Sequence, residues 1–355
     1  MKKNKTILYV LIPFISFPFL LIFVIFTSIN SFCQNQASPI KKAEAAIEVK
    51  IPEGLYLYKP NFREDSVFSP LVLVENKKLV DPYVLVQMMG IKSFLKKYVT
   101  EKTFNVYVGS ELFGKLKNMN LTSISTKNKC QGDNFVPDIQ GNGQYEGKPL
   151  PYGWLKEEKG SGYLYRIYGS TKIVITPESF QMRKKPLILP VTDSDIERMI
   201  EAVQKHIVPK EIEDINIRLE KENRRVIREE GSYLRVAEAY DLDGNGKKDL
   251  VGIYYLNTIN NKGGSSRDIL FILPNTVKVE KVISGSAVPS FMLGGVIDID
   301  QDGVQELIMV SSFMPGTDSG DRRQIEILRY TSEGWVSIFR SKWICDHLGF
   351  YVPYY

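Results

Sequence analysis

The stretch at residues 241–250, DLDGNGKKDL, recurs at residues 298–307 as DIDQDGVQEL. Both copies fit the pattern D-x-D-x-[DN]-G-x-x-[DE]-L. Side-chain oxygens at positions 1, 3 and 5 can surround one point, the glycine at position 6 permits a sharp turn, and the carboxylate at position 9 completes the shell. Several hard oxygen ligands in one short loop are what calcium prefers. Asp, Asn and Gly also dominate metal-free turns, so the recurrence of the pattern is what favours two calcium sites.

Each loop supplies a set of candidate ligands. Position 7 would contribute its backbone carbonyl, and the other positions would contribute their side chains. The predicted ligands are Asp241, Asp243, Asn245, Lys247 and Asp249 in the first loop, and Asp298, Asp300, Asp302, Val304 and Glu306 in the second. The first loop contains Lys247 and Lys248, whereas the second contains no basic residue. We therefore expect the second site to bind calcium more tightly than the first.

The residues that flank the loops indicate strands rather than helices. Leu234–Tyr240 leads into the first loop, Val251–Leu256 leads out of it, and Leu307–Val310 follows the second. These segments are rich in β-branched and aromatic residues. An EF-hand would also place a bidentate Glu at position 12, where this chain has Gly252 and Met309.

A strand-loop-strand unit of this kind resembles the FG-GAP and VCBS calcium-binding repeats, whose loops connect strands in the blades of β-propellers. The resemblance covers roughly residues 232–312 and implies the ligand sets given above. A complete propeller has about four to eight blades, so two copies indicate a partial propeller or a small β-sheet domain. Asp138–Glu146 echoes the pattern with Gln140 in place of an acid, and we interpret it as a surface loop.

The N-terminus carries a membrane signal. Ile7–Phe26 is a run of 20 residues without a charge, preceded by Lys2, Lys3 and Lys5. A helix of this length spans a bilayer, and the preceding lysines place the N-terminus in the cytoplasm. We expect a transmembrane signal anchor with the main body exported, into a periplasm or to the cell exterior. The alternatives are a signal peptide cleaved at Ala43-Glu44-Ala45 and a lipoprotein modified at Cys33.

The predicted architecture is an α+β exported region with a C-terminal all-β domain. We divide the chain into a cytoplasmic stub and anchor at 1–28, a flexible linker at 29–49, an α+β domain at 50–188, a linker helix at 189–209 and a calcium-binding β domain at 210–355. Asp81-Pro82 predicts a helix start, and Ser194 with Glu197 predicts a capping box. Residues 127–159 are interpreted as a long surface loop, and Ile212 onward as β.

Composition narrows the function. The chain has 46 Lys and Arg against 41 Asp and Glu, and the charges outside the N-terminus are interleaved, which argues against a nucleic-acid partner. Two histidines and three cysteines exclude a zinc-ribbon site, although Cys130 and Cys345 could pair. G-x-S-x-G, H-E-x-x-H and P-loop motifs are absent, and Ser93–Lys96 has the S-x-x-K form of a serine acyl enzyme without its partner motifs. We expect a binding, adhesion or structural module that recognises a protein or a surface polysaccharide; the alternative is an exported hydrolase acting on a cell-surface polymer.

Overall fold

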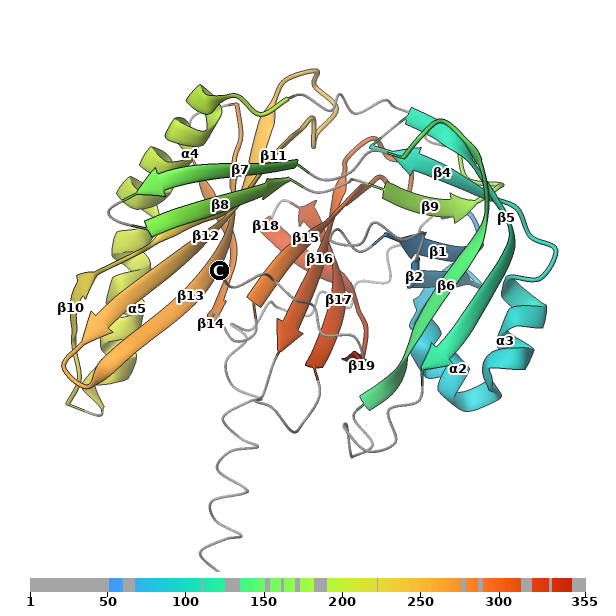
Figure 1. The fold of residues 1–355 in the computed structure, drawn as a ribbon, viewed down its shortest axis with the longest axis horizontal. Helices are drawn as coiled ribbons and strands as arrows, with labels where there is room; N and C mark the ends of the chain where they lie inside the picture. The colour runs from blue at the N-terminus through green and yellow to red at the C-terminus, as the bar shows by residue number, and fades with distance from the viewer. Residues whose placement is uncertain are drawn as a thin grey trace, which may run out of the picture. The chain divides into compact units, whose positions relative to one another are not determined.

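The computed structural model describes residues 51–59, 68–109, 111–124, 135–150, 154–160, 163–169, 173–181, 190–221, 223–275, 279–286, 290–313, 321–331 and 334–346. All of these residues belong to one compact unit. Strands predominate, and the few helices lie on the sheets (Figure 1). None of the described helices has the length and hydropathy needed to cross a bilayer, and the predicted anchor at Ile7–Phe26 lies outside the described residues.

Two sheets organise the strands. A 12-stranded sheet runs in the order β15-β16-β17-β19-β6-β5-β4-β9-β1-β2-β3, with β18 paired to β17. A 7-stranded sheet runs in the order β14-β13-β12-β11-β8-β7, with β10 paired to β12. In the N-terminal half the strands are β1 Gly54–Tyr58, β2 Ser69–Glu75, β3 Lys78–Val80, β4 Phe104–Val108, β5 Glu111–Ile124, β6 Phe135–Gly147, β7 Trp154–Gly160, β8 Tyr163–Gly169 and β9 Ile173–Pro177.

Two antiparallel meanders form the C-terminal half. The first meander consists of β11 Tyr233–Tyr240, β12 Asp249–Asn260, β13 Gly263–Leu273 and β14 Glu280–Ser286. The second meander consists of β15 Ser290–Ile297, β16 Glu306–Phe313, β17 Asp321–Thr331 and β18 Gly334–Arg340. β10 Val226–Glu229 and β19 Trp343–Asp346 complete the set. Each acidic loop joins the first two strands of its meander, as the sequence predicted.

Alternating side chains explain how the meanders pack. On β12, Val251 and Ile253 join Leu307 and Met309 of β16 in one core cluster, so the two meanders share this hydrophobic core. The intervening Ile308 and Val310 of β16 belong to a second cluster with the N-terminal strands. Because successive strand residues point to opposite faces, β16 is buried on both sides. The unbroken apolar run Leu307–Val310 reflects this position.

Four helices of the described residues accompany the sheets. α2 Pro82–Met89 begins at Asp81, whose carboxylate accepts hydrogen bonds from Tyr83 N and Val84 N, and it ends at Gly90, so the predicted helix start is confirmed. α3 Ile91–Tyr98 follows directly. α4 Asp193–His206 and α5 Val208–Glu220 share a core cluster with one face of the first meander.

Two helix details differ from the sequence prediction. The capping box of α4 is formed by Thr192 and Asp195, not by Ser194 and Glu197. The segment after Ile212, predicted as β, is the helix α5, with Val208, Glu211 and Ile215 buried. These positions repeat at helical spacing, and burial of that face outweighs the local alternation of isoleucines.

The predicted loop at 127–159 is also wrong in part, because β6 and all of β7 except Gly160 lie there. Asp138–Glu146, interpreted from sequence as a surface loop, lies within β6. Strand pairing also joins the parts that the sequence suggested as separate domains. β8 pairs with β11 at Tyr168 and Val236, and β19 pairs with β6 at Trp343 and Phe135.

The contact between α4 and β12 depends on Gly252. A Cβ there would lie 2.5 Å from Met199 Cε and 2.6 Å from Phe271 Cζ, whereas a Cβ at Gly264 on neighbouring β13 would meet nothing closer than 3.8 Å. We expect Gly252→Ala to lower the free energy of unfolding by about 1–3 kcal/mol through overpacking. Gly264→Ala, its matched control, should be neutral or slightly stabilising. Urea denaturation measures both, and equal effects would contradict this account of the packing.

Candidate metal centre

The first acidic loop is closed by its own carboxylates. It lies between Tyr240 and Asp249, which pair across the β11–β12 ladder. Asp249 Oδ2 accepts a hydrogen bond from Leu242 N at 2.9 Å, and Asp241 Oδ2 accepts one from Gly246 N at 2.9 Å. The residue at position 9 therefore fixes the beginning of the loop, and the residue at position 1 fixes its turn.

The second loop repeats this arrangement. Ile297 pairs with Glu306 across the β15–β16 ladder. Glu306 Oε2 accepts from Ile299 N at 2.8 Å, and Asp298 Oδ2 accepts from Gly303 N at 3.0 Å. The agreement extends to bond lengths within 0.1 Å at both positions. The two sequence copies are thus two copies of one local structure.

Positions 3 and 5 shape the turn in the same repeated way. The carboxylate at position 3 accepts from the backbone N–H at position 5, and the side chain at position 5 accepts from the backbone N–H at position 7. The bonds are Asn245 N to Asp243 Oδ1 at 3.1 Å, Asp302 N to Asp300 Oδ1 at 3.2 Å, Lys247 N to Asn245 Oδ1 at 2.7 Å, and Val304 N to Asp302 Oδ1 at 2.7 Å. Each of these oxygens keeps a second lone pair.

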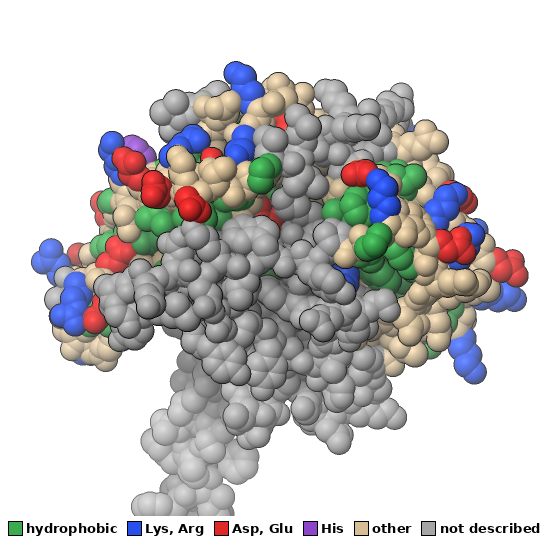
Figure 2. Space-filling view, turned by 45° about the horizontal axis from the view of Figure 1, so that its top comes forward, with side chains coloured by type: hydrophobic (Ala, Val, Ile, Leu, Met, Phe, Trp, Pro, Cys, Tyr) green, Lys and Arg blue, Asp and Glu red, His purple; other side chains and the backbone are tan. Residues whose placement is uncertain are grey.

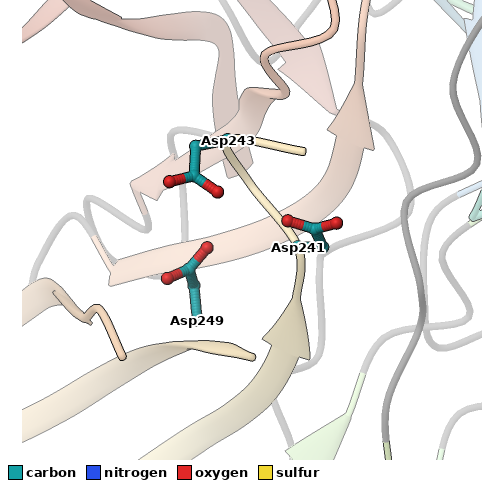
Figure 3. A group of neighbouring side chains, drawn as sticks. All are labelled: Asp241, Asp243 and Asp249. Carbon is teal, nitrogen blue, oxygen red and sulfur yellow. The ribbon is translucent and has the colours of Figure 1, made fainter. Parts of the chain in front are cut away.

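The structure brings three carboxylates together in each loop. Carboxylate oxygens of Asp241, Asp243 and Asp249 all lie within 4.8 Å of one another, and Figure 3 shows these side chains around a common space. The matching group in the second loop is Asp298, Asp300 and Glu306. Asp302, at position 5 of the second loop, is not part of its group. Asn245 and Asp302 are exposed at the turn, as is Lys247, while Val304 is half-buried.

The carboxylate at position 1 of each loop has one buried oxygen without a hydrogen-bond partner. These atoms are Asp241 Oδ1 and Asp298 Oδ1, on side chains that are 4% and 0% exposed. An unpaired buried carboxylate oxygen is costly, because water no longer solvates it. The same atom is thus unpaired in both loops, at a position where a metal ion could compensate it.

Burial opposes the negative charge at these positions. It raises the pKa of Asp298 to about 6, with the neighbouring carboxylates of Asp300 and Asp302 adding to the effect. Burial likewise raises the pKa of Asp249. It raises the pKa of Glu306 to about 8, despite the opposing effect of Arg329. A bound cation would reverse this penalty by favouring the ionised forms.

The basic residues around the loops differ from the sequence prediction. Lys248, counted from sequence as a charge within the first loop, bonds away from it to Pro190 O and Asp195 Oδ2, both at 2.8 Å. The second loop, predicted to have no base nearby, receives Arg329 from β17. Its guanidinium lies 2.7 Å from Glu306 Oε1 and 2.6 Å from Asp300 Oδ2. Two of the premises for ranking the second site as the tighter one, a Lys248 charge within the first loop and no base near the second, therefore differ in the structure, and the ranking itself stays a prediction.

Sequence reasoning missed Arg329 because it lies on a different strand of the meander. Aligning the third strands could have found it. Leu250 pairs with Leu273 in the first meander and Leu307 pairs with Leu328 in the second, so Arg329 takes the place of Pro274.

The two loops are neighbours. Gln305 N of the second loop donates a hydrogen bond of 2.7 Å to Leu242 O of the first. Leu242 follows the first carboxylate of its loop, and Gln305 precedes the last carboxylate of the other. This hydrogen bond couples the backbone conformations of the two loops.

Cys345, predicted as a pairing candidate, is buried in β19 and is disulfide-bonded. Cys130 lies outside the described residues.

Comparison of the chain with protein families, curated proteins and solved structures found no match.

Substitutions at position 4, where both loops have a left-handed backbone, test whether the two loops share one backbone conformation. Gly244 has φ 69° and Gln301, at the same position of the second loop, has φ 62°. A left-handed conformation costs a residue with a Cβ about 1–2 kcal/mol. We expect Gly244→Gln to lower the free energy of unfolding by about 1 kcal/mol and Gln301→Gly to be neutral or stabilising, in calcium-free urea denaturation. A Gly244→Gln variant as stable as the original would show that the loops differ in backbone.

Proposed function

We propose that this chain is an exported, membrane-anchored binding or adhesion module whose acidic loops hold calcium. The observation that carries the proposal is the repeated loop, in which the same buried oxygen, Asp241 Oδ1 or Asp298 Oδ1, lacks a hydrogen bond. The FG-GAP and VCBS resemblance supports the same interpretation, because each loop joins two antiparallel strands of a meander.

Calcium fits the donor set better than other metals. The loops offer carboxylate, amide and carbonyl oxygens, and zinc sites are usually built with His or Cys ligands, which neither loop contains. Magnesium demands near-ideal octahedral geometry at short distances, whereas calcium accepts six to eight oxygens in flexible arrangements. Calcium affinities of about 10⁻⁴–10⁻³ M suit extracellular modules, which agrees with the predicted export.

We infer that the ion has a structural role. In each loop the carboxylates at positions 1, 3 and 9 already bind backbone N–H groups, so the ion would rigidify a turn that the chain itself has formed. Among the described residues, the close groups of acidic side chains are the two in the loops. Because these carboxylates are committed to closing the loops, we propose the binding module rather than the hydrolase, which would need a further acidic pair elsewhere.

Surface charge bears on the class of macromolecule that the module binds. On the face drawn in Figure 2, basic and acidic side chains of the described residues are interspersed. Such a surface lacks the one-signed basic patch typical of nucleic-acid binding. We therefore retain a protein or a surface polysaccharide as the proposed ligand, with the membrane contacted through Ile7–Phe26.

Calcium should raise the melting temperature of the purified full-length protein in detergent. An ion that binds only the folded state stabilises it by about 2.7 kcal/mol at 100 times Kd. We expect a rise of several degrees in calcium compared with chelator, reduced in Asp241→Asn and unchanged in Asp214→Asn, whose carboxylate is exposed on α5 away from the loops. Equal melting temperatures in calcium and chelator would overturn the proposal.

A further inference from the structure

Arg329 places a permanent cation inside the second acidic group. Its side chain is 7% exposed, Nε lies 2.7 Å from Glu306 Oε1, and Nη2 lies 2.6 Å from Asp300 Oδ2. A guanidinium remains charged at any physiological pH. Two of the three carboxylates that could hold a metal ion in this loop are therefore paired with a cation of the chain itself.

Both carboxylate oxygens of Glu306 already accept a bond, one of them from a cation. Its Oε1 binds Arg329, and its Oε2 accepts the backbone N–H of Ile299 at 2.8 Å. A metal ion at this carboxylate would compete with both bonds. It would also approach the guanidinium, and like charges repel most strongly where water is excluded.

The first loop lacks such a cation. Among the described residues, no ion pair involves Asp241, Asp243 or Asp249, and Pro274 takes the place of Arg329. Lys248 directs its ammonium group to Asp195 at 2.8 Å, outside the loop. Within the part of the chain that the structure describes, the carboxylates of the first loop therefore have no positive side-chain partner.

From this contrast we propose that calcium binds the first loop, and that in the second loop Arg329 takes over the role of the ion. The proposal rests on the proposed calcium-binding function of the loops. It reverses the order of affinities expected from sequence. Arg329 thus compensates part of the negative charge of the second loop without metal, while the first loop depends on calcium. The unpaired Asp298 Oδ1 leaves the second loop a weak residual affinity.

On this proposal, the conformation of the first loop depends on calcium and that of the second loop does not. Calcium removal would loosen the turn of the first loop, while Arg329 would keep the second in place. The hydrogen bond from Gln305 N to Leu242 O, 2.7 Å long, connects the calcium-dependent first loop to the second. This arrangement makes the first meander the calcium-sensitive part of the exported region.

Isothermal titration of the full-length protein with calcium chloride tests the proposal. The original chain should show one tight binding event. Asp241→Asn should weaken that event by about 10- to 100-fold, the usual effect of disturbing a metal site, whereas Asp298→Asn should leave it within about twofold. Arg329→Gln should add a second event at least tenfold tighter than any weak binding in the original, and Arg329→Lys, which keeps the charge, should not.

The outcomes separate this inference from the proposed function. Two events of equal affinity in the original chain, or loss of the tight event in Asp298→Asn alone, would overturn the role of Arg329 and leave the calcium function intact. An Arg329→Gln variant that folds and gains no calcium would also overturn it. Absence of binding in every variant would overturn the calcium function itself. If Arg329→Gln fails to fold, the comparison of Asp241→Asn with Asp298→Asn decides.

Discussion

The bond from the last carboxylate of each acidic loop to the backbone N–H of the second residue holds the loop end of both meanders. Asp249 binds Leu242 N and Glu306 binds Ile299 N. Each bond pins a hydrophobic residue, and both Leu242 and Ile299 are buried in core clusters. The carboxylate thus connects the start of one strand, the turn before it and the core beneath it. Carboxylate chemistry and strand packing are inseparable at this point.

The same geometry buries several carboxylates, and their negative charge can be compensated by an arginine or by a metal ion. Buried carboxylates are tolerated when a cation compensates them. Elsewhere this chain uses arginine, as in the pair of Arg235 and Asp268 at 2.8 Å and the pair of Arg323 and Asp138. Arg329 extends this solution to the second loop. The first loop, which pairs with no arginine of the described ranges, is where an external ion has the most to contribute.

Local features of this protein were predictable from sequence, and the loops are the best example. A chelating turn is encoded in ten consecutive residues, so its form does not depend on distant parts of the chain. The helix start at Asp81 was predictable for the same reason, because a cap acts on the next three residues.

Features set by distant contacts were not predictable. The strand β6 was taken for a loop because it is rich in glycine. Those glycines in fact permit close strand approach, since a Cβ at Gly141 would lie 2.7 Å from Asn120 O of β5. α5 was missed because its buried Glu211 pairs with Arg267 and Lys281, which lie on other elements. The role of Arg329 is not predictable from sequence for the same reason, because it lies on β17 and contacts a loop distant in the chain.

A diffraction experiment on crystals grown in millimolar calcium tests the central claim most directly. Anomalous scattering locates the ion directly, whereas melting temperatures and titration calorimetry report its binding only indirectly. The account predicts a peak about 2.3–2.6 Å from Asp241 Oδ1, shared with oxygens of Asp243 and Asp249. A first loop with water or no density at that point, in crystals saturated with calcium, would contradict it.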